Sequence, residues 1–122
     1  MYLILSTLLH LISAIPLLPY IKAYGYIEVI CVSTTMSVLY HLDESNRVIA
    51  FLDYSYALIW FLYDIYMSFH TPFLYQIMLV NGFSCIIHAY PATNYTTFHS
   101  IWHIINALKC FYVSLLLKDI IK

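Results

Sequence analysis

Residues 48–69 read VIAFLDYSYALIWFLYDIYMSF, and this stretch decides the fold class. The hydrocarbon core of a bilayer is about 30 Å thick, and an α-helix needs about 20 apolar residues to cross it. The stretch has that length and carries only two formal charges, Asp53 and Asp64. It shows no period-two alternation of apolar and polar residues, which argues against a β-strand. The stretch therefore predicts a membrane-spanning helix.

The composition of the whole chain supports the same interpretation. Of its 122 residues, 63% are hydrophobic and only 9% are charged, whereas a soluble domain has about 25% charged residues. The chain lacks the polar material from which a water-exposed surface is built, so lipids are its expected surroundings. Its net charge of −1 leaves no basic surface for nucleic acid, which is excluded as a partner.

Four further apolar segments accompany residues 48–69. They cover residues 2–18, 26–41, 72–89 and 95–117. The connections between them are only a few residues long, so successive helices are expected to be antiparallel neighbours. No internal repeat or domain boundary divides the chain. The sequence predicts one all-α membrane domain over residues 1–122, an integral bundle of about five transmembrane helices.

Several polar residues interrupt these segments, although ionisable groups are costly inside a membrane and tend to mark function. Ser37 and His41 are four residues apart and share one helix face, as do His99 and His103. Asp53 lies near the start of the third span. The second span ends, and the third and fifth begin, on the same side of the membrane. Helix direction therefore places all five residues at a common depth.

This set of side chains has the composition of a catalytic zinc site. Three neutral imidazoles with an open fourth position hold a zinc ion that activates water. Asp53 is then a candidate general base, and Ser37 a candidate group to hold the water or an oxyanion. Other interpretations stay open. The histidine pair of residues 99 and 103 could form interhelical hydrogen bonds, Ser37 could be a small packing residue, and Asp53 could face water in the headgroup region.

The remaining polar residues predict structural roles. Asp64 on the third span is expected to pair with Lys109 on the fifth. His88 ends the fourth span on the side of the predicted zinc site and could support a metal ligand from outside. His10 and His70 have no partner at ligand spacing and are expected at the membrane interface.

The order of these motifs resembles a known superfamily. SVLYHLDES (residues 37–45) and FLDYSYALIWF (residues 51–61) are followed by FHSIWHI (residues 98–104). The pattern S-x-x-x-H, an Asp about a dozen residues on, and a C-terminal H-x-x-x-H is similar to the CREST superfamily. That superfamily comprises alkaline ceramidases, adiponectin and progestin receptors, a group of lipid-remodelling proteins and the myomaker-like proteins. The resemblance is closest to the myomaker-like branch.

The resemblance implies specific roles for these residues. His41, His99 and His103 would be zinc ligands, and Asp53 and Ser37 would attend the reacting water. The implied chemistry is hydrolysis of lipid amide or ester bonds within the bilayer, although some members have no established activity. The superfamily has seven spans, whereas about five fit here. The loss falls between Asp53 and His99, and removing two spans preserves helix direction while taking away part of the wall around a lipid substrate.

Two functions follow as hypotheses. The first is a zinc-dependent hydrolase that acts on membrane lipids. The second is a non-catalytic accessory subunit that contacts other subunits of a larger membrane complex, for example a protist mitochondrial respiratory or ATP synthase complex. The mitochondrial inner membrane and the endoplasmic reticulum or Golgi are both compatible locations.

Overall fold

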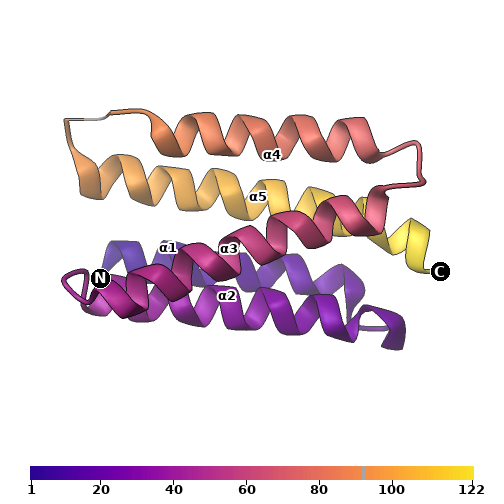
Figure 1. Cartoon of the computed structure of the whole chain (residues 1–122), viewed down its shortest axis with the longest axis horizontal. Helices are drawn as coiled ribbons and strands as arrows, with labels where there is room; N and C mark the ends of the chain where they lie inside the picture. The colour runs from indigo at the N-terminus through magenta and orange to yellow at the C-terminus, as the bar shows by residue number, and fades with distance from the viewer. Residues whose placement is uncertain (92) are drawn as a thin grey trace.

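The computed structural model describes residues 1–91 and 93–122, which form an all-helical bundle without any strand (Figure 1). The all-α prediction is confirmed for these residues. The elements are α1 (Tyr2–Leu8), the 3₁₀ helices η1 (Leu9–Leu17) and η2 (Ile21–Ala23), α2 (Tyr24–Leu42), α3 (Arg47–Ser68), α4 (Leu74–Ala89) and α5 (Tyr95–Ile121). The boundaries agree with the predicted segments to within a few residues, because the apolar runs end at polar or proline-containing turns.

The first predicted segment is an α-helix for only seven residues and then tightens into η1. Pro16 lies inside η1 and has no N–H to donate to the preceding turn. Polar side chains in this segment also hydrogen-bond to backbone carbonyl oxygens. His10 Nδ1 lies 2.7 Å from the Thr7 carbonyl oxygen, and the Ser13 hydroxyl donates to the His10 carbonyl at 2.6 Å. Such i to i−3 bonds compete with the α-helical ladder and favour the tighter turn.

Short connections make the long helices antiparallel, as predicted (Figure 1). Asn46 caps α3 by accepting hydrogen bonds from the Val48 and Ile49 amides, and Asn94 caps α5 by accepting one from Thr97. The α2–α3 connection, the C-terminal end of α4 and the N-terminal end of α5 lie at the same end of the bundle as the N-terminus (Figure 1). The C-terminal end of α2 and the N-terminal end of α5 therefore lie at one end of the molecule.

Helix α5 is the central packing element and contacts α1, η1, α3 and α4. Its buried Val113 and Leu117 join Leu17, Ile30 and Ile77 in one apolar core. Among the described residues, buried ones are nevertheless as often polar as apolar, 12 of each. The polar residues lie inside this bundle, and large apolar side chains cover its outside.

A buried hydrogen-bond network replaces the expected ion pair between Asp64 and Lys109. Asp64 is only 1% exposed and accepts hydrogen bonds from the Tyr26 hydroxyl and from Asn81 Nδ2 (3.1 Å). Lys109 Nζ donates to Asn81 Oδ1 at 2.9 Å, and Trp60 Nε1 donates to the Tyr26 hydroxyl at 2.8 Å. The prediction of a direct pair is wrong, because Asn81 of α4 stands between the two charges and bonds to each.

Among the described residues, α3 is the one helix both long and apolar enough to cross a membrane. Only 11% of its most apolar window is buried within the bundle, so its apolar side chains face outward. Helices α1–η1 and α4 are apolar but shorter. The polar side chains that α2 and α5 carry lower their hydropathy, and several of these, including Ser33, Thr34 and His103, point into the bundle.

Candidate metal centre

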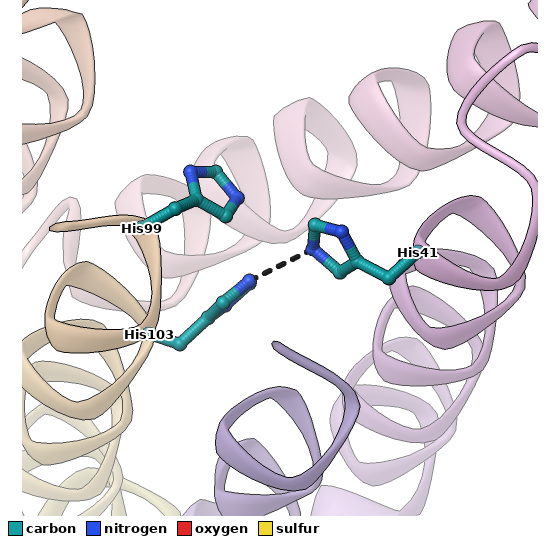
Figure 2. Close-up of side chains that lie close together, drawn as sticks. All are labelled: His41, His99 and His103. Carbon is teal, nitrogen blue, oxygen red and sulfur yellow. Dashed lines mark hydrogen bonds between the residues drawn. The ribbon is translucent and has the colours of Figure 1, made fainter. Parts of the chain in front are cut away.

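Three histidines converge where α2 ends and α5 begins (Figure 2). His41 lies in the last turn of α2, and His99 and His103 lie one turn apart on α5. One ring nitrogen from each lies within 4.8 Å of the others, and His41 Nε2 is 3.0 Å from His103 Nε2 (Figure 2). The predicted convergence of these side chains is confirmed.

The spacing of the nitrogens suits a small divalent cation. Two imidazole nitrogens on a tetrahedral zinc ion are about 3.3 Å apart, since each Zn–N bond is about 2.0–2.1 Å. The separation between His41 and His103 is close to that value. The longest separation, at most 4.8 Å, exceeds it by about 1.5 Å, which side-chain rotation of the half-buried His99 can supply. The donor set therefore fits zinc.

The hydrogen bonds around the histidines define their protonation. His41 Nδ1 lies 2.9 Å from Glu44 Oε1. Because a carboxylate only accepts, the neutral tautomer that fits this contact has its proton on Nδ1 and a lone pair on Nε2. The Thr7 hydroxyl donates to the Leu3 carbonyl at 2.7 Å and can therefore only accept from His103 Nε2, 3.2 Å away. Without a metal, a proton on His103 Nε2 is shared between Thr7 and His41. With a metal, the His41 tautomer is already the ligating one.

His103 itself has an unfulfilled hydrogen-bonding group. Its side chain is 1% exposed, and its Nδ1 atom has no hydrogen-bond partner among the described residues. Buried ring nitrogens are normally hydrogen-bonded, so Nδ1 calls for a water partner. The nitrogen that faces His41 is Nε2, so a cation bound between these two rings would leave Nδ1 unbonded. Among the described residues of the cluster, His103 is thus the histidine with a buried ring nitrogen that the helix packing leaves without a partner.

A cavity of about 370 Å³ adjoins the histidines and reaches between α2, α3, α4 and α5. Its wall includes His99 and His103 together with the predicted Ser37 and Asp53. These two side chains therefore lie in the same chamber as His99 and His103. Among the described residues no hydrogen bond joins Asp53 to a histidine.

The structure adds neighbours that the sequence did not indicate. His10 was expected at the membrane interface, but it is buried and its ring centroid lies 5.4 Å from that of His103. Its Nε2 is 2.7 Å from Asn106 Nδ2, and Asn106 Oδ1 accepts a hydrogen bond from Ser84 at 2.7 Å. That prediction is wrong because η1 packs directly on α5 and turns His10 inward. Both ring nitrogens of His10 are occupied, so it supports His103 from the side.

Two aromatic neighbours hold the ring of His99. His88 lies 5.7 Å from it between ring centroids, and Tyr95 stacks on it at 4.9 Å. His88 thus lies beside His99 at the edge of the site, next to the ligands that it was predicted to support. His70 is exposed and lies outside the site. The sequence could have indicated Glu44, which follows His41 by three residues and lies in the turn after α2. The contact of Thr7 with His103 depends on how η1 and α1 rotate against α5. No protein-family model, curated protein or solved structure matches this chain.

Proposed function

We propose that this chain is a zinc-dependent membrane hydrolase that cleaves an amide or ester bond of a lipid, related to the CREST superfamily. The convergence of His41, His99 and His103 beside a cavity that also holds Ser37 and Asp53 carries the proposal. Five helices are enough to form this chamber. The two additional spans of the superfamily would lie between the segments that carry Asp53 and His99, and neither would supply one of these five residues.

The distribution of side chains supports a membrane environment. Large apolar residues are exposed on every long helix, while half of the buried residues are polar. In water this arrangement would expose apolar surface and bury polar groups, both at a cost in free energy. In lipid the same arrangement is favourable, because polar groups then satisfy one another inside the bundle.

Each residue has a defined part in the proposed reaction. His41, His99 and His103 would hold the zinc ion, which supplies a Lewis acid for the carbonyl and lowers the pKa of water. Glu44 would orient His41 through Nδ1. Asp53 would take the proton from the attacking water and pass it to the leaving group. The Ser37 hydroxyl would donate a hydrogen bond to the carbonyl oxygen as negative charge develops there.

Replacement of the general base tests the reaction. Asp53→Asn keeps the shape of the side chain and removes its capacity to take a proton, so hydrolysis of lipid amides or esters should fall by about 10²–10⁴-fold. The measurement is release of fatty acid from a panel of ceramides and phospholipids by zinc-loaded protein. Zinc content should stay unchanged in this variant. Full activity of Asp53→Asn, or no hydrolysis by the unaltered chain, would contradict the proposal.

Glu44 tests the metal separately from the reaction. A carboxylate that accepts from the far nitrogen of a ligating imidazole fixes its tautomer, and its loss typically costs about 10–100-fold in metal affinity. Glu44→Ala should therefore weaken zinc binding by that factor in a competition titration with a chelator. Glu44→Gln retains an acceptor oxygen and should lose less. Equal affinity of Glu44→Ala and the unaltered chain would show that His41 does not use this contact to bind zinc.

One observation favours a second function, that of an accessory subunit. On α4, residues Tyr75, Leu79, Phe83 and Ile86 are all exposed and recur at helical spacing along one face. Helix α4 lies at an edge of the bundle (Figure 1), so this face is free to pack on another membrane subunit. A zinc-loaded chain that is active as a monomer would argue against this function.

A further inference from the structure

A second, smaller pocket opens beside the metal centre at the same end of the bundle. Its volume is about 170 Å³. Five aromatic side chains from three helices and the residue after α4 line it. The name tyrosine pocket is used here for these residues: Tyr40, Tyr54, Tyr90, Tyr95 and Phe98. His88 and His99 complete the wall. The aromatic rings do not fill the space between them.

The rings form a partly open enclosure. Ring centroids are 6.5 Å apart for Tyr40 and Tyr54, and 5.4 Å apart for Tyr90 and Phe98. Tyr54, Tyr90 and Tyr95 are exposed, so a ligand can enter from outside the bundle. This geometry differs from a packed aromatic cluster, in which the rings cover one another.

The charges around the tyrosine pocket are negative. Glu44 is bonded to His41, whose ring lies 5.2 Å from that of Tyr40. Asp53 lines the adjoining cavity together with Tyr40 and Tyr54. No lysine or arginine is among the described residues that line the tyrosine pocket. Electron-rich ring faces with nearby carboxylates favour a cation.

We propose that the tyrosine pocket binds a quaternary ammonium group, the choline-type head group of a membrane lipid. Such a group has no N–H to donate, so hydrogen-bonding side chains cannot hold it, whereas aromatic faces attract it through cation–π interactions. Four residues, Tyr40, Tyr54, His88 and His99, line both this pocket and the larger cavity. A lipid held by its head group here therefore reaches the chamber of Ser37 and Asp53. The inference rests on the proposed function in naming this lipid as the substrate class, but head-group binding itself needs no metal.

The binding experiment compares head groups on one acyl chain length. Metal-free full-length chain in an uncharged detergent is titrated with short-chain phosphatidylcholine, phosphatidylethanolamine and phosphatidylglycerol below their critical micelle concentrations. Binding is followed by calorimetry. Phosphatidylcholine should bind about fivefold more tightly than phosphatidylglycerol, which has no cation for one or two cation–π contacts. Phosphatidylethanolamine should also bind more weakly than phosphatidylcholine, because its ammonium N–H groups lose hydrogen bonds to water that aromatic faces do not replace.

Two substitutions separate the ring face from the hydroxyl group. Tyr95→Leu and Tyr54→Leu, on different helices, should each weaken phosphatidylcholine binding by about two- to fivefold. Tyr95→Phe and Tyr54→Phe keep the ring and should bind as the unaltered chain does. Helical content by circular dichroism establishes that each variant is folded. Equal affinity for the three head groups, or equal losses in the Leu and Phe variants, would overturn the proposal and leave these tyrosines as ordinary interfacial aromatics.

Zinc content measured on the same proteins keeps the two proposals apart. His103→Ala should lose zinc and retain the preference for phosphatidylcholine, because His103 does not line the tyrosine pocket. If the unaltered chain binds zinc normally but shows no preference for phosphatidylcholine, only the tyrosine pocket is refuted. Absence of zinc from the unaltered chain, with the preference intact, would refute the metal centre alone.

Discussion

His103→Ala is expected to reduce zinc content from about one ion per chain to none. His103 is the most buried of the three candidate ligands, and its Nε2 lies 3.0 Å from that of His41. Removing it leaves two ligands and an apolar gap, so the loss of affinity should exceed the roughly 10–100-fold cost of losing a supporting carboxylate. Elemental analysis of protein purified with zinc and then dialysed measures the effect, and lipid hydrolysis should disappear with the metal.

Two other histidines provide matched controls for this experiment. His70 is exposed, so His70→Ala removes one imidazole without touching the cluster and should leave zinc content unchanged. His10 lies beside His103 but both its ring nitrogens have partners. His10→Asn should therefore lower zinc affinity only moderately. If His103→Ala retains stoichiometric zinc, the close approach of His41 and His103 is a metal-free hydrogen bond and the metal centre is refuted.

The main features of the candidate site follow from simple properties of the sequence. Apolar run length located the helices, and short connections forced them to alternate in direction. Alternation alone brings the end of α2 and the start of α5 to one end of the bundle, and the four-residue spacing of His99 and His103 then places both imidazoles on one helix face. These arguments need no knowledge of side-chain packing, which is why they predicted the contact of His41 with the pair.

Features that depend on helix rotation could not be predicted in this way. Thr7 and His10 meet His103 only because α1 and η1 turn their polar residues toward α5. The helical spacing of Ser6, Thr7, His10 and Ser13 could have indicated a polar face, but it does not indicate which neighbouring helix that face meets. Asn81 is a similar case. From the sequence, a direct ion pair of Asp64 and Lys109 would neutralise both charges. Only the position of α4 shows that the Asn81 side-chain amide bonds to both residues instead.

That buried network leads to a large expected effect on stability. Lys109→Met should lower the free energy of unfolding by about 3–5 kcal/mol, because removal of one partner leaves a buried charge uncompensated. Asp64 would keep its bonds to Tyr26 and Asn81, but Asn81 Oδ1 would lose its donor, and the carboxylate would lose the nearby Lys109 cation. Titration of the chain from mild into denaturing detergent, followed by circular dichroism, measures the change.

A double substitution distinguishes charge compensation from simple loss of packing. If the charges matter, Asp64→Asn combined with Lys109→Met should cost less than the sum of the two single changes, since no unpaired charge is then left inside. The control is Leu108→Met at the neighbouring exposed position of α5, where a change within about 0.5 kcal/mol is expected. Strict additivity would mean that Asp64 and Lys109 act independently. A Lys109→Met effect as small as that of the control would mean that the carboxylate needs no counter-charge, and the Asn81 bridge would then be a consequence of helix packing rather than a cause of it.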